Sequence, residues 1–277
     1  MATIHGNNEG PIEINYLEHG SGDPLVLIGG ITSVLQVWDL MVPELSKTYR
    51  VITPDNRGSG GTRVPDDDGD RRPARFAGDI LALLDGLELS KVHLVGASMG
   101  GMVVQEFALN HPERLASLTI CCSNVGGSRT VNAAPEIIAS LFGSAAQASE
   151  AMDPEARRAT LKNLIHPDSI VKCADNLDFY LELRDRYPHS GEEMGRRATG
   201  IGSLDSYEGL EKLDVPTLVM TGSHDLLVPK ENSEIIHDAV ANSELVEIDE
   251  TGHIFFVERP EASCAALLGF LEKHPMG

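Results

Sequence analysis

The chain has 277 residues, and its 42 acidic against 22 basic side chains give a formal charge of −20. Hydrophobic residues make up 42% and charged residues 23%, which are the proportions of a folded globular protein and not of a disordered one. A charge this negative argues against nucleic acid and anionic membrane surfaces as partners, because both attract a basic face. No apolar run reaches the ~20 residues needed to span a bilayer, and the first residues show no secretory signal.

The four cysteines, Cys121, Cys122, Cys173 and Cys264, form no CxxC pair. The adjacent pair at 121–122 lies in an apolar run, which is typical of buried, unreactive thiols. We therefore expect a reduced, cytoplasmic compartment. The sequence leaves the oligomeric state open, with a homodimer as one alternative.

Strand-like and helix-like segments alternate along most of the chain. Short apolar runs bounded by Gly, Pro and Asp predict strands at residues 12–19, 24–28, 50–53, 91–95, 115–122, 216–220 and 244–248. Helices are predicted between and after them at residues 76–87, 99–109, 231–240 and 261–273. This alternation predicts an α/β fold with a mostly parallel sheet covered by helices on both faces.

The alternation stops at Ser123. Residues 124–212 show no strand pattern, and helices are predicted there at residues 135–142, 154–165 and 175–186. We therefore expect a core domain at residues 1–123 and 213–277, and a helical cap, or lid, at residues 124–212 over the carboxyl edge of the sheet. Candidates to line a substrate pocket beneath this cap, although their helical spacing favours the cap's own core, are Met152, Leu161, Leu164, Phe179 and Leu183.

A candidate nucleophile lies between a predicted strand and a predicted helix. Residues 96–100 match the pattern G-x-S-x-G around Ser98. A strand-to-helix turn this tight forces the serine into a strained conformation, and the flanking glycines leave the space it needs. The serine hydroxyl is then presented at the carboxyl end of the sheet, near a helix N-terminus that favours negative charge.

A serine nucleophile needs a base and a group that orients the base. His253 lies in a loop just after the last predicted strand, at the same sheet edge as Ser98, and His224 is the only comparable competitor. Asp225 follows the preceding strand and is the expected acid, whereas Asp249 precedes the histidine loop. The chain order is Ser98, Asp225, His253.

This order and the surrounding motifs resemble α/β-hydrolase-fold serine hydrolases of the esterase and lactonase type. Residues 55–60 are similar to the family's D-x-R-G-x-G turn, and residues 252–261 to its G-H-x(4)-E-x-P-E ending. The stretch from Ser98 to Leu115 resembles 3-oxoadipate enol-lactonases and related carbon–carbon-bond hydrolases. Position 98 is serine, which disfavours the dehalogenases and epoxide hydrolases of this fold, since these use aspartate.

The resemblance also implies an oxyanion hole made of backbone N–H groups. Met99 would supply one donor and Ile31 the other, with Gly30 as an alternative to Ile31. Family members commonly have His-Gly before this loop, whereas this chain has Gly29-Gly30. The loop must therefore be held in place without that histidine.

The expected reaction is hydrolysis of a carboxylic ester or lactone of a small organic molecule through an acyl-enzyme. Ser98 would attack the carbonyl, His253 would take its proton, and Asp225 would orient His253. No metal ion or organic cofactor is expected. Two alternatives remain: a carbon–carbon bond hydrolase acting on a β-diketone or dienone with the same three residues, and a small-molecule receptor of the same fold.

Overall fold

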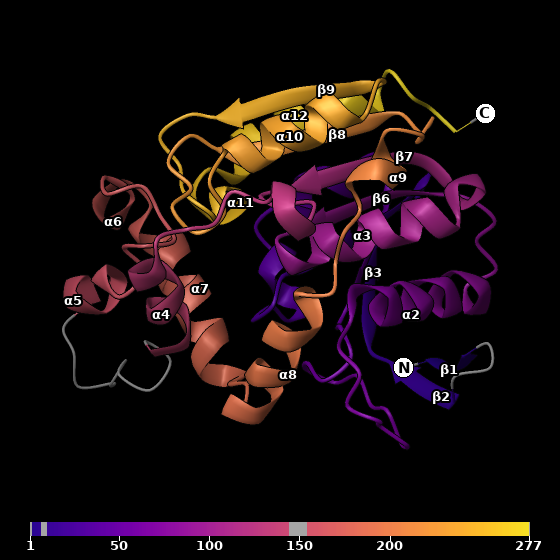
Figure 1. Cartoon of the computed structure of the whole chain (residues 1–277), viewed down its shortest axis with the longest axis horizontal. Helices are drawn as coiled ribbons and strands as arrows, with labels where there is room; N and C mark the ends of the chain where they lie inside the picture. Colours follow the sequence, from indigo (N-terminus) through magenta and orange to yellow (C-terminus); the bar gives the residue numbers. More distant parts are fainter. Residues whose placement is uncertain (1, 7–9, 144–153, 277) are drawn as a thin grey trace.

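A twisted seven-stranded sheet forms the centre of the computed structural model, which describes residues 2–6, 10–143 and 154–276 (Figure 1). Its strands, in chain order, are β3 (Tyr16–His19), β4 (Pro24–Ile28), β5 (Arg50–Pro54), β6 (Val92–Ala97), β7 (Leu115–Cys121), β8 (Thr217–Gly222) and β9 (Ser243–Ile248). Their order across the sheet is β3-β5-β4-β6-β7-β8-β9. Only β3 runs antiparallel to its neighbour, so the prediction of a mostly parallel sheet is confirmed.

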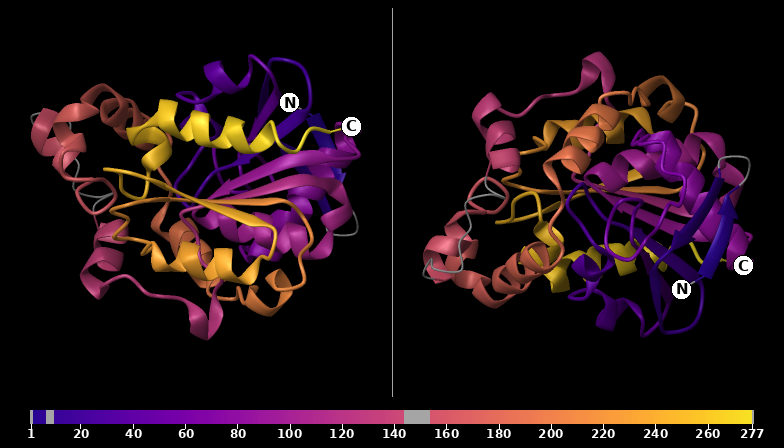
Figure 2. Two further views of the ribbon diagram at one scale, coloured as in Figure 1. Left: turned by 90° about the horizontal axis from the view of Figure 1, so that it is seen from above. Right: turned by 90° about the horizontal axis from the view of Figure 1, so that it is seen from below.

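Helices cover both faces of this sheet, as Figure 2 shows for α12 on one side and α10 on the other. One face carries α2 (Pro73–Gly86), α3 (Met99–Asn110), α9 (Tyr207–Leu210) and α10 (Glu231–Ala239). The other face carries α1 (Val42–Leu45), α11 (Phe255–Glu258) and α12 (Pro260–Leu271). Short 3-10 turns lie at Leu35–Trp38, Pro112–Arg114 and Gly127–Arg129.

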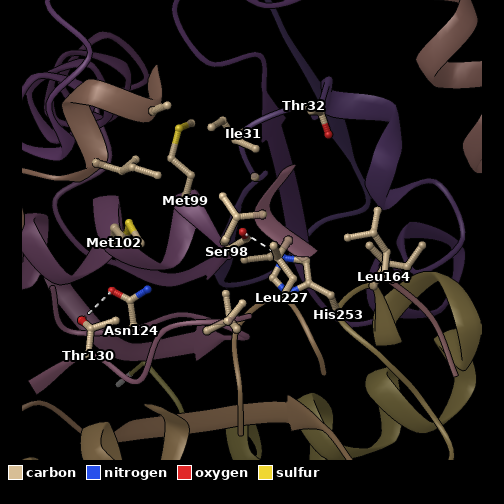
Figure 3. Close-up of a pocket in the computed structure, with 18 of the residues that line it drawn as sticks. Ile31, Thr32, Ser98, Met99, Met102, Asn124, Thr130, Leu164, Leu227 and His253 are labelled. Atoms are coloured by element: carbon tan, nitrogen blue, oxygen red, sulfur yellow. Dashed lines mark hydrogen bonds between the residues drawn. The ribbon is translucent and has the colours of Figure 1, made fainter. Parts of the chain in front are cut away.

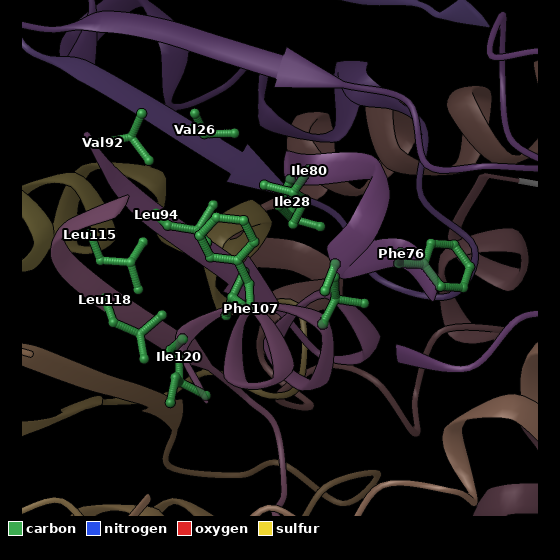
Figure 4. Close-up of a cluster of buried hydrophobic side chains, with 14 of the residues drawn as sticks. Val26, Ile28, Phe76, Ile80, Val92, Leu94, Phe107, Leu115, Leu118 and Ile120 are labelled. Carbon is green, nitrogen blue, oxygen red and sulfur yellow. The ribbon is translucent and has the colours of Figure 1, made fainter. Parts of the chain in front are cut away.

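Strand β4 shows how the sheet separates two apolar cores. Leu25 and Leu27 pack into the core beneath α1 and α12, whereas Val26 and Ile28 pack into the core beneath α2 and α3 (Figure 4). Successive side chains of a strand point to opposite faces, so a continuous apolar run fills both cores. Each such buried side chain contributes roughly 1.5–3 kcal/mol to the free energy of folding. The two cores thereby support the edge of the sheet at which Ser98 follows β6.

The single strand predicted at residues 12–19 is wrong, because the structure divides it in two. β2 (Gly10–Ile14) pairs antiparallel with β1 (Ala2–Gly6) in a separate two-stranded sheet, and β3 joins the main sheet. Asn15 lies at the break, where its amide N–H donates to Thr62 Oγ1 at 3.0 Å and its side chain donates to Asp55 Oδ2 at 2.7 Å. These partners lie in the loop after β5, so the break depends on tertiary contacts and not on the local pattern.

The described part of residues 124–212 contains helices and loops but no strand, apart from one isolated bridge between Gly126 and Asp205. Its helices are α4 (Pro135–Gly143), α5 (Pro154–Ala159), α6 (Ser169–Lys172), α7 (Ala174–Arg186), α8 (Gly191–Ile201) and α9. The helix predicted at residues 154–165 is shorter than expected. Helix α8 was not expected, because its three glycines and its many charged residues weaken any apolar period.

The helices α4 to α7 lie beyond the end of the sheet to which β7 and β9 point (Figure 1). Helix α9 packs instead on α3 and α10, so this last part of the segment joins the helical layer over the sheet. No helix among the described residues is both long and apolar enough to cross a bilayer.

Candidate active site

Ser98 occupies the sharp turn between β6 and α3, with φ 57° and ψ −118°. A positive φ is strained for a residue with a side chain, and it turns the Ser98 side chain away from the helix that follows. A Cβ on Gly96 would overlap the carbonyl oxygen of Gly100, and a Cβ on Gly100 would overlap that of Ile28. The two glycines of the G-x-S-x-G pattern are therefore required by backbone contacts.

The structure brings Ser98, His253 and Asp225 together from three separate loops (Figure 3). His253 Nε2 lies 2.9 Å from Ser98 Oγ, and His253 Nδ1 lies 2.8 Å from Asp225 Oδ2. A carboxylate can only accept, so the proton of the neutral ring resides on Nδ1 and Nε2 is free to accept from the serine hydroxyl. Asp225 and His253 are both buried, and Ser98 is half-buried.

The competing residues lie elsewhere. The ring of His224 packs against that of His166, with 5.3 Å between the ring centroids, and it does not line the cavity at Ser98. Asp249 is exposed, and its carboxylate accepts the backbone N–H of Glu250. Neither side chain reaches the hydrogen-bonded row formed by Ser98, His253 and Asp225.

Two backbone N–H groups are candidates to bind an oxyanion. Met99 is the first residue of α3, where the amide lacks a partner within the helix. Gly30 N donates to Ser33 Oγ at 3.0 Å, so this amide is already occupied. Ile31 also borders the cavity, and the occupied amide of Gly30 favours Ile31 over Gly30 as the second donor.

Arg197 of α8 holds the loop that carries Ile31. This guanidinium is fully buried, and its Nη1 donates to the carbonyl oxygen of Ile31 at 2.6 Å. Its Nη2 donates to Arg57 O at 2.8 Å and to Ser59 Oγ at 2.9 Å, and its Nε donates to Glu193 Oε1 at 2.7 Å. Burial lowers the pKa of Arg197, opposed by its ion pair with Glu193. A residue of the helical segment thus braces this loop, which lacks the histidine that the resemblance implies.

Glu193 joins this contact to a second buried arginine. Its carboxylate also accepts from Arg71, whose Nε lies 2.7 Å from Glu193 Oε1. Burial of Glu193 opposes ionisation, but the hydrogen bonds from Arg71 and Arg197 outweigh it and hold the pKa of Glu193 below its ordinary value. Sequence reasoning missed Arg197 and Glu193, because no local pattern distinguishes them from the other charged residues of α8.

Glu258 holds the histidine loop in a similar way. Its Oε2 accepts Gly252 N at 2.8 Å, next to His253, and its Oε1 accepts His166 N at 2.8 Å and Ser169 Oγ at 2.7 Å. Burial raises the pKa of Glu258, while these donors act to lower it. The carboxylate therefore ties the loop of His253 to the helical segment.

A cavity of about 410 Å³ opens directly in front of Ser98 and His253. Its walls come from both parts of the chain: Met99 and Leu227 belong to the core, and Leu164 and Ile201 belong to the helical segment. Of the lining residues expected from sequence, Leu164 borders this cavity and Leu161 is fully buried in the core. Phe179 and Leu183 do not border it, and Met152 lies outside the described residues.

Cys122 is a further group near the site that sequence reasoning did not connect with it. Its thiol lies within 4.8 Å of ligand atoms of Asp225 and His253, the only such cluster of three among the described residues. The pKa of Cys122 is raised well above its ordinary value by burial and by the charge of Asp225. Both carboxylate oxygens of Asp225 and both ring nitrogens of His253 already have hydrogen-bond partners. The cluster therefore fits a hydrogen-bonded row better than a set of free metal ligands.

Proteins with this architecture are well represented among known sequences and structures. A 2-hydroxymuconate semialdehyde hydrolase from Pseudomonas sp. strain CF600 is 29% identical over 269 residues, which cover 93% of this chain and 89% of that protein. The 3-oxoadipate enol-lactonase 2 of Acinetobacter baylyi is 24% identical over 256 residues, covering 91% and 90% of the two chains. A thermophilic esterase from Thermogutta terrifontis superposes with a TM-score of 0.82 at 26% identity and 99% coverage of both chains.

The family described as alpha/beta hydrolase fold matches residues 23–260, which include the sheet, Ser98, Asp225 and His253. The relatives named above are hydrolases by name, and the neighbour of known structure has the same fold over the whole chain. The chain belongs to the alpha/beta hydrolase fold family.

Proposed function

We propose that this protein is a serine hydrolase that cleaves a carboxylic ester or lactone of a small organic molecule. The observation that carries the proposal is the row of hydrogen bonds from Ser98 Oγ to His253 Nε2 and from His253 Nδ1 to Asp225 Oδ2. This row ends on a strained serine that faces a cavity of about 410 Å³. The names of an enol-lactonase and an esterase among its relatives support the same class of reaction.

The reaction begins at Ser98. His253 Nε2 takes the hydroxyl proton as Oγ attacks the carbonyl carbon, and Asp225 stabilises the imidazolium that forms. The tetrahedral intermediate collapses when His253 returns the proton to the leaving alcohol, which leaves an acyl group on Ser98. Water then attacks the acyl-enzyme with the same assistance from His253, and the carboxylic acid departs.

The negative charge on the carbonyl oxygen is assigned to the N–H groups of Met99 and Ile31. Met99 begins α3, so the helix dipole adds to its donor. One such donor typically contributes ~10²–10³ in kcat. Two contacts on either side of this N–H support the assignment. Gly30 O, which belongs to the same peptide group as the Ile31 N–H, accepts from Ser33 N at 3.2 Å. Arg197 holds the next peptide group, between Ile31 and Thr32, through the carbonyl oxygen of Ile31.

We also propose that the cap predicted at residues 124–212 covers the site with the part of this segment that precedes α9. Leu164, Tyr180 and Ile201 from this segment border the same cavity as Ser98 and His253. A substrate bound there contacts both parts of the chain, so the segment determines which acyl and alcohol groups fit.

The nucleophile is tested by Ser98→Ala. We expect kcat on p-nitrophenyl esters to fall by ~10⁴–10⁶, because the three residues act as a unit and only binding and oxyanion contacts remain. An alkyl fluorophosphonate should label the wild-type protein at Ser98 and leave the variant unlabelled, as read by mass spectrometry of the intact chain.

Ser203→Ala is the matched control, since the Ser203 hydroxyl donates to Gly200 O and the residue does not border the cavity. It should retain wild-type kcat and labelling. Ester hydrolysis that persists in Ser98→Ala would end the proposal. Tight ligand binding without turnover by the wild type would instead favour a receptor.

A further inference from the structure

The cavity at Ser98 has an uncharged wall. Among the described residues that border it there is no Asp, Glu, Lys or Arg. Its larger apolar residues include Ile31, Met99, Met102, Leu164, Ile201 and Leu227. Its polar residues besides Ser98 and His253 are neutral, namely Thr32, Ser33, Asn124, Thr130, Asn132 and Tyr180. Figure 3 shows Met99, Met102 and Leu227 grouped around Ser98.

Arg197 lies on the same helix as two lining residues, but its guanidinium is hydrogen-bonded to other parts of the protein. Arg197 belongs to α8 together with Ala198 and Ile201, which border the cavity. Its Nε, Nη1 and Nη2 all donate to protein acceptors, namely Glu193, Ile31 O, and Arg57 O with Ser59 Oγ. Among the described residues, a substrate anion would therefore find no free cationic side chain at this wall.

The described edge of the cavity is apolar as well. Val131 and Ile138 border the cavity and are 38% and 40% exposed, and both are among the few large apolar side chains that the described surface exposes. Exposed apolar side chains that meet at a cavity mark a surface for apolar ligands. The overall charge of −20 adds a long-range repulsion against anions.

We propose that the substrate of this site is neutral and largely apolar, an ester or lactone whose acyl and alcohol parts carry no carboxylate or phosphate. The inference rests on the proposed hydrolase function and specifies its substrate class. A carboxylate that enters such a wall loses its hydration and gains no ion pair, which disfavours binding and the transition state together.

A matched pair of esters tests the charge preference. p-Nitrophenyl heptanoate and the p-nitrophenyl monoester of adipic acid share a leaving group and differ mainly in a terminal carboxylate. We expect kcat/KM to be about 100-fold higher for the heptanoate, because an unpaired polar group in a binding pocket discriminates strongly. The rate of each ester with Ser98→Ala is subtracted as background. Equal values of kcat/KM, or a preference for the adipate, would overturn the inference.

A second test of the charge preference places a positive charge at the edge of the cavity. Ile138 is exposed enough to accept a charged side chain without burying it. Ile138→Lys should narrow the ratio of kcat/KM between the two esters about tenfold, because it supplies the missing cation. Ile138→Gln changes polarity without charge and should leave the ratio near that of the wild type. Equal ratios in the lysine and glutamine variants would contradict the role assigned to charge.

Binding to Ser98→Ala separates this inference from the reaction itself. Isothermal titration of the variant with both esters should give at least tenfold tighter binding of the heptanoate. If neither ester is hydrolysed by the wild type but the heptanoate binds more tightly, the hydrolase proposal fails, whereas the preference of the cavity for a neutral, apolar ligand stands. If both are hydrolysed equally well and bind equally tightly, the hydrolase proposal stands and the substrate class is wrong.

Discussion

Asp225 uses its two carboxylate oxygens for two different purposes. Oδ1 accepts the backbone N–H groups of Leu227 and Val228 at 2.9 and 2.8 Å, which fixes the side chain in its own loop. Oδ2 is left to accept Nδ1–H of His253 at 2.8 Å. An asparagine has a single acceptor oxygen and cannot serve all three donors, so its amide group would face either the loop or the imidazole.

Asp225→Asn should therefore lower kcat by ~10²–10⁴ with little change in fold, since the imidazole loses both its orientation and its counter-charge. His224→Ala provides the comparison, because His224 is the adjacent residue and does not border the cavity. It should retain activity within about tenfold. Both variants are assayed on one ester, with circular dichroism to check the fold. An inactive His224→Ala beside a nearly wild-type Asp225→Asn would reassign the acid.

Ser98, Asp225 and His253 were identifiable from sequence because each follows a recognisable strand. Parallel strands carry their carboxyl ends to one edge of a sheet, so residues just after three strands meet there even though 155 positions separate Ser98 from His253. Arg197 has no such signal. Its partners Ile31 and Arg57 are 166 and 140 positions away and accept through backbone carbonyls, which any residue type offers.

At the scale of elements, α3 approaches the end of β4 so closely that only glycine fits between them. A Cβ on Gly100 would overlap Ile28 O and lie 2.8 Å from Gly29 O, and both atoms are backbone. This contact places the N-terminus of α3 beside the loop at residues 29–31. The two candidate oxyanion donors, Met99 and Ile31, come from these neighbouring elements.

Gly100→Ala should lower both the melting temperature and kcat, because the strand end and the loop must move to make space for the methyl group. Gly195→Ala is the matched control in α8, where a Cβ would meet nothing within 4 Å. That substitution should raise the free energy of unfolding by about 0.5–1 kcal/mol, as expected for alanine at an open helix position. Thermal unfolding and ester kinetics measure the pair. A Gly100→Ala variant with wild-type melting temperature and kcat would contradict the close contact between α3 and the end of β4.

Helix α8 acts on the loop of Ile31 through Arg197, which we regard as a positioning residue. Arg197→Met should lower kcat ~10–100-fold with a smaller change in KM, because the loop loses its anchor while the cavity wall stays in place. Arg197→Lys should have a higher kcat than Arg197→Met, since lysine keeps the positive charge but lacks the planar guanidinium that donates to several acceptors at once. If Arg197 had a purely structural role, the variants would contain less folded protein, but kcat per Ser98 labelled by the fluorophosphonate would be unchanged.

Arg196→Met is the control for that series. Arg196 is the next residue along α8, and its guanidinium is exposed and pairs with Glu192. We expect wild-type kcat and a melting temperature within about 2 °C of the wild type, because exposed ion pairs contribute little. If Arg196→Met and Arg197→Met lower kcat equally, the loss cannot be assigned to the contact with Ile31.

At the scale of the whole molecule, a buried histidine links stability to pH. His93 is the second residue of β6 and has no exposed surface, and its Nδ1 lies 2.8 Å from Ser117 Oγ. Burial lowers the pKa of His93 to about 4 from the 6.5 of an unfolded chain. Between these values the unfolded chain binds a proton that the folded protein does not, so stability rises with pH and is lost as pH falls from 6.5 toward 4.

His93→Gln should therefore flatten this dependence. At about 1.4 kcal/mol for each pKa unit, His93 accounts for a loss of about 2 kcal/mol between pH 7 and pH 5. Urea unfolding at the two pH values measures the difference, and the change in free energy should be smaller in the variant by that amount. The glutamine side chain can still form a hydrogen bond with Ser117. Because each protein is compared with itself at two pH values, any constant loss of stability in the variant cancels. An unchanged slope would show that His93 titrates normally.

The sequence by itself determined the alternation of strands and helices, the helical segment after Ser123 and the position of Ser98, Asp225 and His253 after strands of the sheet. These follow from local rules, because apolar periodicity, turn glycines and the position after a strand act within a few residues of one another. The tertiary structure alone decided the division of the first strand at Asn15 and the uncharged wall of the cavity. It also decided the brace from Arg197, the link from Glu258 and the occupied amide of Gly30. Each of these depends on which buried donor meets which acceptor across a packed interface, and that pairing exists only once the chain has folded.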